Sequence, residues 1–397
     1  MQLSNRQLFL LNTAQTSHAP RLIEVERAEG VYLYGPNGEK YIDLVSGFAV
    51  SNIGHRHPKV LQAIANQLDK YLHVTVYGEF VQAPQVNLAT KLLSVLPAHF
   101  DTVYFTNSGA EAVEGAMKIA KKFTGRREII AAEKAYHGST QGALSLIGNA
   151  EYHTAYAPLL PEIAFIRYNE LPDIQRITEA TAAVILEAVQ GEAGIRVPDT
   201  AYMRAIRNRC DETGTLLIFD EIQTGFGRTG NLFAFEHYGI EPDILLMAKG
   251  MGGGMPIGAF VANRKVMDVI KDNPVLGHIT TFGGHPVSCA AALASLNVIL
   301  EDHLMDGVMR KAHLFRQHLQ HPAIREIRGI GLMLGLQMDS FSQVESISDY
   351  CARHGVIVDW FLHCETALRI APPLTIGDEE IALACGVIVE AVEQAIT

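Results

Sequence analysis

Short apolar runs alternate with amphipathic stretches between about residue 100 and residue 262. The apolar runs predict seven strands, at Thr102–Thr106, Glu128–Ala132, Ile163–Tyr168, Ala183–Leu186, Leu216–Phe219, Ile244–Met247 and Gly258–Ala262. Amphipathic stretches such as Ala110–Lys122 and Tyr202–Glu212 predict helices between these strands. Strands that are apolar on both faces and separated by helices are typical of a mostly parallel α/β sheet. Ligands of such sheets bind beyond the carboxyl ends of the strands, so we look for chemistry there.

The flanking regions have a different pattern. Residues 31–45 predict a β-hairpin that turns at Pro36-Asn37-Gly38, and a helix follows Pro58. Beyond residue 286 we expect a helix to about Leu300, one strand over residues 327–336 and a closing helix near Asp378–Ala395. The expected organisation is an N-terminal segment (1–55) that contributes to a small domain, a large domain (56–285) and a C-terminal small α+β domain (286–397).

Composition narrows the possible functions. The 397 residues include 43 acidic and 32 basic side chains, a net charge of −11. This balance argues against nucleic acids and anionic membranes as partners, because both need a basic face. The five cysteines are scattered, with no C-x-x-C pair, and no signal peptide or apolar run long enough to span a membrane is visible. We therefore expect reduced thiols and a cytoplasmic location.

Polar residues with catalytic potential follow two of the strands. Ser108-Gly109-Ala110 begins a helix, where free backbone N–H groups and the helix dipole can bind a phosphate. The alternative is an ordinary turn with Ser108 as the N-cap. Glu187 closes another strand, where a buried carboxylate needs a partner: it could cap a helix or orient a functional group.

Asp220 and Lys249 end two further strands. Asp220 follows four apolar residues, so its carboxylate requires a cation or donor, either a metal ion or a protonated ring nitrogen. Lys249 precedes a glycine-rich run and could be an amine of lowered pKa, as Schiff-base chemistry needs. Alternatively, its chain extends from the strand end to solvent.

The combination is more specific than its parts. A phosphate cradle, a buried acid and a buried lysine at the strand ends of one sheet match the phosphate, ring nitrogen and aldehyde of pyridoxal 5′-phosphate (PLP). Tyr136-His137-Gly138 follows another strand and could supply an aromatic face for the ring.

With these blocks in place, the chain resembles the class III, fold-type I, PLP-dependent aminotransferases, the group that acts on acetylornithine, ornithine, 4-aminobutyrate and putrescine. The resemblance runs from about Ala28 to the C-terminus. Its motifs are Gly54-His-Arg-His-Pro58, Asn107-Ser-Gly-Ala-Glu-Ala, Tyr136-His-Gly, Glu187-x4-Glu192, Phe219-Asp-Glu-Ile-Gln-Thr-Gly-Phe-Gly-Arg-Thr-Gly230, Ala248-Lys-Gly-x-Gly-Gly-Gly-x-Pro-Ile-Gly258, Thr281-Phe-Gly-Gly and Leu368-Arg-Ile-Ala-Pro-Pro-Leu. It implies a seven-stranded, mostly parallel large-domain sheet and a smaller α+β domain.

The resemblance also implies roles for individual residues. Lys249 would be the Schiff-base lysine and proton shuttle, and Asp220 would pair with the pyridinium nitrogen. The remaining cofactor contacts would be Ser108, Gly109 and Ala110 at the phosphate, Tyr136 stacked on the ring with His137 beside it, Gln223 at the ring hydroxyl, Glu187 nearby, and Thr281 at the phosphate of a partner subunit in a homodimer.

Substrate binding is implied for three more residues. Arg369 resembles the family's α-carboxylate clamp, and Glu192 resembles the switch that covers this arginine while an ω-amine donor is bound and then admits 2-oxoglutarate. The alternative for this pair is a plain salt bridge. Tyr77 falls near a substrate-lining position.

One position departs from the family pattern. Relatives acting on acetylornithine, ornithine or 4-aminobutyrate usually carry an arginine directly after the aromatic-x-Gly motif, and here that position is Ser139. Because serine cannot form a bidentate ionic bond with a carboxylate, our hypothesis is a diamine or ω-amino acid donor used with 2-oxoglutarate in a ping-pong reaction. Acetylornithine or ornithine is the alternative donor.

Other functions are disfavoured by the sequence. His55-x-His57 has no further metal-ligand spacing around it, and Gly252-x-Gly254 lacks the rest of a nucleotide loop. PLP racemases and decarboxylases share the lysine and the acid, but the Glu192–Arg369 pair favours transamination, because only a two-substrate cycle needs a clamp that opens. A non-enzymatic binding protein would leave Lys249 unexplained.

Overall fold

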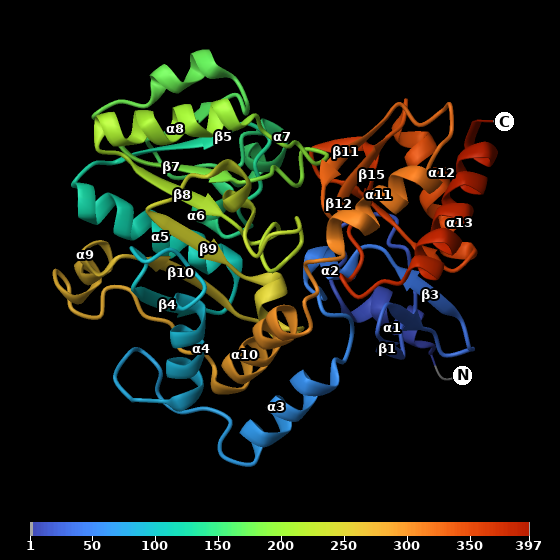
Figure 1. Cartoon of the computed structure of the whole chain (residues 1–397), viewed down its shortest axis with the longest axis horizontal. Helices are drawn as coiled ribbons and strands as arrows, with labels where there is room; N and C mark the ends of the chain where they lie inside the picture. The colour runs from blue at the N-terminus through green and yellow to red at the C-terminus, as the bar shows by residue number, and fades with distance from the viewer. Residues whose placement is uncertain (1–2, 397) are drawn as a thin grey trace.

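The computed structural model describes residues 3–396, and its centre is a seven-stranded sheet (Figure 1). The strand order is β4-β10-β9-β8-β7-β5-β6. The strands are β4 (Thr102–Thr106), β5 (Glu128–Ala132), β6 (Ile163–Ile166), β7 (Thr181–Glu187), β8 (Leu216–Asp220), β9 (Ile244–Met247) and β10 (Gly258–Ala262). β10 runs antiparallel to both neighbours, while the pairs among β5 to β9 are parallel. The predicted seven-stranded, mostly parallel sheet is confirmed.

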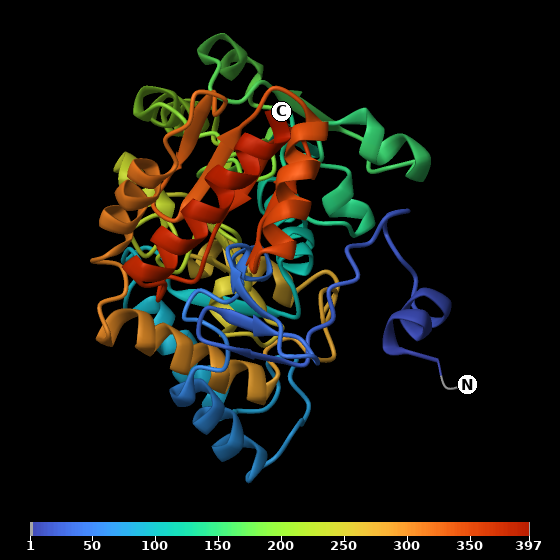
Figure 2. The ribbon, with the colours of Figure 1, turned by 90° about the vertical axis from the view of Figure 1, so that its right-hand side faces the viewer.

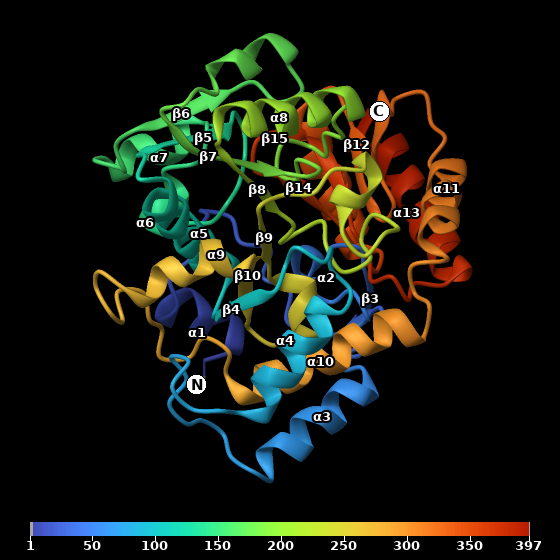
Figure 3. The same ribbon diagram turned by 60° about the vertical axis from the view of Figure 1, so that its left-hand side comes forward.

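The five inner strands of the sheet bury both of their faces, while the edge strands β4 and β6 are mostly half-buried. Burial on both faces explains the continuous apolar runs. In β5, Ile130 and Ala132 belong to one core while Ile129 and Ala131 belong to another. The first core is covered by α3 (Pro58–Leu68), α4 (Ala83–Leu93), α8 (Thr200–Thr213) and α10 (Pro286–Glu301). The second is covered by α5 (Gly109–Thr124) and α9 (Arg264–Met267), which lie side by side in Figure 3.

A third core lies in the C-terminal part of the chain, on the right of Figure 1. There a sheet of order β11-β12-β15-β14 packs with helices. These elements are β11 (Glu326–Ile330), β12 (Met333–Gln337), β14 (Asp359–Phe361), β15 (Cys364–Ile370), α11 (Val308–His318), α12 (Phe341–Arg353) and α13 (Asp378–Ile396). The single strand predicted over residues 327–336 was wrong: the run is a hairpin, because Gly331 at φ 57° reverses the chain.

The predicted N-terminal hairpin forms and is part of a third sheet. This sheet contains β1 (Arg27–Glu29), β2 (Tyr32–Tyr34), β3 (Lys40–Asp43) and β13 (Val356–Ile357). β3 pairs in parallel with β13, through Ile42 with Val356 and Asp43 with Ile357. The N-terminal region is thereby joined to the C-terminal part of the chain.

Arg228 connects the large-sheet region of the chain with its N-terminal and C-terminal regions. It is fully buried, and its Nη1 donates to the carbonyl oxygens of Leu332 (3.0 Å) and Pro372. Its Nη2 donates to Asn52 Oδ1 (2.6 Å). One side chain therefore bonds to the N-terminal region and to two C-terminal segments. Burial lowers the pKa of Arg228 to about 9.

The N-terminal helix α1 (Asn5–Asn12) stands apart from the rest of the chain in Figure 2 and buries none of its residues. The remaining elements are short: α2 (Ser46–Ala49), α6 (Gln141–Leu144), α7 (Ala150–His153) and the 3₁₀ helices η1 (Thr154–Tyr156), η2 (Leu171–Arg176), η3 (Ala234–Tyr238), η4 (Lys249–Gly252) and η5 (Asp268–Lys271). Within residues 3–396, no helix has the length and apolar character needed to cross a membrane.

Candidate active site

The carboxyl ends of β7, β8 and β9 bring the predicted site residues together. Glu187 and Asp220 are direct partners in the β7–β8 register, and Lys249 follows β9 by two residues. These residues line a cavity of about 600 Å³, which we call the Asp220 pocket. Nine of the predicted cofactor residues line this pocket: Ser108, Gly109, Ala110, Tyr136, His137, Glu187, Asp220, Gln223 and Lys249.

Asp220 is held by two hydrogen bonds at the floor of this pocket. It is 4% exposed, its Oδ2 lies 2.7 Å from His137 Nδ1, and its Oδ1 accepts the Ile222 backbone N–H at 2.9 Å. His137 therefore orients the carboxylate instead of merely lying beside a bound ring. The remaining lone pairs of Asp220 are free to accept a proton-bearing group in the pocket.

Glu187 is the second carboxyl group of the pocket. Its Oε1 accepts the Gly191 N–H at 3.0 Å, while its buried Oε2 has no hydrogen-bond partner among the described residues. Burial raises the pKa of Glu187 well above its usual value, and the nearby Asp220 charge raises it further. An unsatisfied buried oxygen of this kind indicates a missing polar ligand.

The N-terminus of α5 forms one wall of the pocket. Ser108 is the N-cap, and its hydroxyl accepts the Glu111 N–H at 3.2 Å, so the N-cap interpretation holds together with the anion cradle. β10 packs closely behind this turn, since a Cβ on Gly258 would lie 2.3 Å from the Ser108 carbonyl oxygen. The first N–H groups of α5 remain available for an anion.

Lys249 has a left-handed backbone conformation, with φ 46°, directly after β9. Such a conformation is uncommon for lysine and occurs where the surroundings impose it. Burial lowers the pKa of the Lys249 amine; the charge of Glu192 opposes this effect and that of Arg369 adds to it. A neutral amine at this position can act as a nucleophile or base.

A second cavity, of about 710 Å³, adjoins the first and shares Lys249, Tyr136 and Ser139 with it. We call it the Phe48 pocket. Its lining residues are Thr16, Gly47, Phe48, Tyr136, Ser139, Gln141, Leu144, Ile147, Tyr152, Tyr156, Glu192, Lys249 and Leu362. Lys249 is the only basic side chain among these described residues.

Arg369 and Glu192 meet at the edge of the Phe48 pocket. Arg369 Nη2 lies 2.6 Å from Glu192 Oε2, and both residues are buried. Burial by itself would raise the pKa of Glu192, but the Arg369 charge and hydrogen bond lower it to about 2. Glu192 is therefore ionised at neutral pH and covers the guanidinium.

Gln223 bonds the second carboxylate oxygen of Glu192, the residue proposed as the switch. Its Nε2 donates to Glu192 Oε1 at 3.1 Å, and the Leu362 backbone N–H donates to Glu192 Oε2 at 3.1 Å. The sequence assigned Gln223 only to a cofactor hydroxyl. Its place between the two pockets connects the Asp220 pocket to Glu192.

Three predicted site residues line neither pocket: Arg369, described above, Thr281 and Tyr77. Thr281 is exposed, next to Thr280, whose hydroxyl bonds Asn107 of the Asp220 pocket at 2.7 Å. Tyr77 lines a third cavity together with Thr280 and Gly283. In the single chain, neither side chain faces Lys249 across these pockets.

Phe48 and Phe361 are site residues that the sequence does not predict. Arg369 Cζ lies over both rings, 5.0 Å from the Phe48 centroid and 4.5 Å from that of Phe361. The available signals were weak: Phe48 follows a glycine before the Gly54-His55 motif, and Phe361 ends a short strand.

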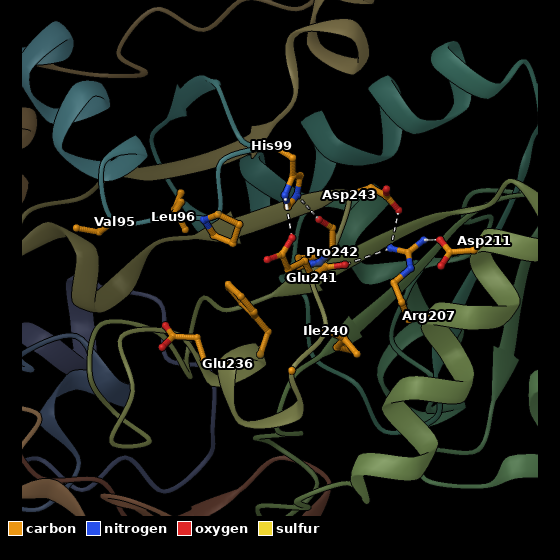
Figure 4. Close-up of a pocket in the computed structure, with 13 residues that line it drawn as sticks. Val95, Leu96, His99, Arg207, Asp211, Glu236, Ile240, Glu241, Pro242 and Asp243 are labelled. Atoms are coloured by element: carbon orange, nitrogen blue, oxygen red, sulfur yellow. Dashed lines mark hydrogen bonds and ion pairs between the residues drawn. The ribbon is translucent and has the colours of Figure 1, made fainter.

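A further hollow, of about 900 Å³, lies away from these residues (Figure 4). Its charged side chains pair with one another: Arg207 with Asp243 (2.9 Å) and Asp211 (2.7 Å), and His99 with Glu241 (3.1 Å). None of the predicted site residues lines it, so its volume does not identify the reactive centre.

Comparison with known proteins places this geometry in a family. The family model for class-III aminotransferases matches residues 13–392. The acetylornithine aminotransferase of Methanosarcina mazei is 42% identical over 363 residues, covering 90% of this chain and 88% of the relative. That of Methanopyrus kandleri is 38% identical over 366 residues, with 91% and 92% covered. A solved ornithine aminotransferase of Toxoplasma gondii, described with partial occupancy of PLP at its active site, has a TM-score of 0.91 at 28% identity and covers 99% of this chain and 96% of its own.

The Asp220 pocket has the features that PLP needs. It offers the N-terminus of α5 for a phosphate, a fixed carboxylate for a ring nitrogen, a buried amine for an aldehyde, and an unsatisfied oxygen on Glu187. The fold, the family match and this pocket agree: the chain belongs to the class-III aminotransferases, and it is a PLP-dependent transaminase of fold type I.

Proposed function

We propose that this chain transfers an ω-amino group from a diamine or ω-amino acid to 2-oxoglutarate in a ping-pong reaction. The observation that carries the donor class is the lining of the Phe48 pocket. Ser139 stands where, by the family resemblance, acetylornithine-, ornithine- and 4-aminobutyrate-type members usually carry a carboxylate-binding arginine, and its Oγ lies 3.3 Å from the Tyr136 hydroxyl. With no basic side chain but Lys249 among the described lining residues, the remote ammonium of a diamine suits the pocket better than the remote carboxylate of an ω-amino acid, so the diamine is the favoured donor of the two.

The residues of the Asp220 pocket would have different roles in the reaction. PLP supplies an electron sink when it is bound. Asp220, oriented by His137, would keep the ring nitrogen protonated, and Ser108, Gly109 and Ala110 would hold the phosphate. Lys249 would hold the aldehyde until the donor amine displaces it, and the freed Lys249 amine would then move a proton from the amine-bearing carbon of the donor, a role that its lowered pKa supports.

Glu192 and Arg369 would allow two different substrates to use one pocket. While the amine donor is bound, Glu192 neutralises Arg369. When the 2-oxo acid arrives, its α-carboxylate would displace Glu192 and pair with the guanidinium. The ionised state of Glu192 supports this exchange, because one carboxylate replaces another at the guanidinium and the buried Arg369 charge stays paired throughout.

We further propose a cytoplasmic homodimer in which Thr281 reaches the partner's cofactor phosphate. Exposed apolar side chains surround this residue: Val275, Leu276, Ile279 and Phe282 are 47–71% exposed. Such a cluster supports a contact with another protein surface. All five cysteines are free thiols, which supports a reducing compartment.

N-Acetylornithine or ornithine is the second candidate donor, and the names of the relatives at 38–42% identity favour it. A donor panel distinguishes the two. The PLP-loaded enzyme is mixed with putrescine, cadaverine, ornithine or N-acetylornithine, and conversion to the pyridoxamine form is followed by absorbance. We expect the diamines to react faster. Much faster turnover of ornithine or N-acetylornithine would overturn the diamine proposal and leave the aminotransferase assignment intact. Lys249→Ala is the control, and it should not react with any donor.

A further inference from the structure

Four consecutive residues next to the Phe48 pocket form a left-handed turn. Ser46, Gly47, Phe48 and Ala49 have φ values of 48°, 63°, 62° and 64°. Three of the four are not glycine, and L-residues adopt this conformation in succession only when their surroundings enforce it. The turn is therefore a costly feature that calls for an explanation.

Polar contacts hold the N-terminal end of the turn. Asp43 Oδ1 accepts the N–H groups of Val45 (2.9 Å) and Ser46 (2.8 Å). The Ser46 hydroxyl donates to the carbonyl of Ala371 at 2.6 Å, two residues beyond Arg369. The turn is thus fixed to the segment that carries the arginine.

The turn determines where the aromatic ring of Phe48 lies. Phe48 is 44% exposed and lines the pocket, yet its ring lies 5.0 Å from the Cζ atom of the nearly fully buried Arg369. A cation beside an aromatic face is stabilised, and more strongly when water is excluded. Phe48 therefore contacts the guanidinium at the boundary between the pocket and the protein interior.

One nitrogen on the edge of the guanidinium lacks a partner. Nη2 donates to Glu192 (2.6 Å) and to the Trp360 carbonyl oxygen (3.4 Å), while the buried Nε of Arg369 has no hydrogen-bond partner among the described residues. The N–H groups of Nε and Nη2 point in parallel along one edge of any guanidinium, so a carboxylate can bind both. An incoming α-carboxylate could thus form two bonds where Glu192 forms one with Nη2.

We propose that Phe48 is a positioning residue for Arg369: the left-handed turn places its ring so that the guanidinium is held ready for bidentate pairing with the α-carboxylate of the 2-oxo acid. This inference rests on the proposed role of Arg369 as the carboxylate clamp. It assigns Phe48 to the acceptor half of the reaction, with an effect on binding and little on the chemical step.

The test uses the PLP-loaded enzyme with Phe48→Leu, Phe48→Tyr and Phe48→Gly. Binding of glutarate, a dicarboxylate without the reactive oxo group, is measured by calorimetry, and KM and kcat are measured with 2-oxoglutarate. For Phe48→Leu we expect the glutarate Kd and the 2-oxoglutarate KM to rise about tenfold, or about 1.4 kcal/mol, with kcat within twofold. Phe48→Tyr keeps the aromatic face and should stay within twofold of the wild type. Phe9→Leu, at a 41% exposed ring on α1, is the matched control and should change nothing.

Phe48→Gly separates positioning from a purely structural role. Phe48→Gly and Phe48→Leu both lose the ring, but only glycine adopts positive φ without a steric penalty. The melting temperature of Phe48→Gly should therefore exceed that of Phe48→Leu, while glutarate binding weakens in both. A melting temperature below that of Phe48→Leu would overturn the proposal that the turn is a strained device for placing the ring.

Arg369→Met distinguishes this inference from the proposed function. If Arg369→Met abolishes glutarate binding but Phe48→Leu leaves it unchanged, the positioning role is wrong and the clamp stands. If Arg369→Met leaves glutarate binding unchanged, both the clamp and the positioning role fall.

Discussion

Glu221 is a fully buried carboxyl group directly after Asp220. Its Oε1 accepts the Phe235 N–H at 2.7 Å, and the Thr224 hydroxyl donates to its Oε2. Burial raises the pKa of Glu221 from 4.5 to about 7 despite these hydrogen bonds. The folded protein therefore binds this proton more tightly than the unfolded chain.

This difference predicts a pH dependence of stability. A raised folded-state pKa adds stability below pH 4.5, and that stability is lost as the pH rises through about 7. The total contribution is about 3 kcal/mol. Glu221→Gln imitates the protonated carboxyl, so denaturant unfolding should show a smaller loss of stability between pH 5 and 8 in the variant than in the wild type. Equal pH slopes would contradict the assignment.

Ser139 offers a test of donor choice at a single residue. Ser139→Arg would place a planar cation in the Phe48 pocket, which would pair with a remote carboxylate and repel the second ammonium of a diamine. We expect the ratio of kcat/KM for N-acetylornithine to that for putrescine to rise at least about tenfold, as one charge-assisted hydrogen bond allows. Ser139→Ala is the size control and should leave the ratio near its wild-type value. An unchanged ratio in Ser139→Arg would show that the donor's remote end lies elsewhere.

At the scale of elements, the contact of β10 with the start of α5 determines the shape of the phosphate cradle. Gly258 pairs with Thr106, and a Cβ there would lie 2.3 Å from the Ser108 carbonyl oxygen. Because backbone atoms surround this position, Gly258→Ala must displace the turn. We expect the PLP dissociation constant to rise about tenfold, because the displaced turn would lose the equivalent of one hydrogen bond to the phosphate. Titration of the cofactor-free protein with PLP measures this constant. Gly386→Ala on α13, where a Cβ meets nothing within 4 Å, should leave PLP affinity unchanged.

Most of the large sheet, and the site residues at its strand ends, can be predicted from the sequence. The strands are recognisable because each is an apolar run, buried on both faces in the five inner strands. Ser108, Asp220 and Lys249 are recognisable because each lies at the carboxyl end of a strand or just beyond it. The β11–β12 hairpin was missed because its turn interrupts the apolar run by so few residues.

Contacts between distant segments could not be predicted. Nothing local to Phe48 indicates that its ring meets Arg369, and nothing near Gln223 indicates that it bonds Glu192. Each pair joins elements that only tertiary packing brings together. For this reason the roles of the site residues remain predictions, although the structure gathers nine of them in one pocket.

At the scale of the whole molecule, Arg228 bonds the N-terminal region to two C-terminal segments, so its loss should lower the stability of the protein. Arg228→Met would leave the carbonyls of Leu332 and Pro372 and the Asn52 amide oxygen without their donor. We expect the free energy of unfolding to fall by about 3 kcal/mol in denaturant titrations. Arg325→Met removes an exposed pair with Asp339 and should change stability little. A similar small effect for Arg228→Met would mean that water replaces the lost donors.

The pairing of β3 with β13 has a consequence for synthesis of the chain. The hairpin of β2 and β3 emerges early from the ribosome, but the strand that covers its edge is made only when residues 356–357 appear. Until then its unpaired backbone groups are open to wrong partners. The nascent protein must therefore carry an uncovered strand edge through most of its translation, and the period before release is when we expect it to depend most on chaperones.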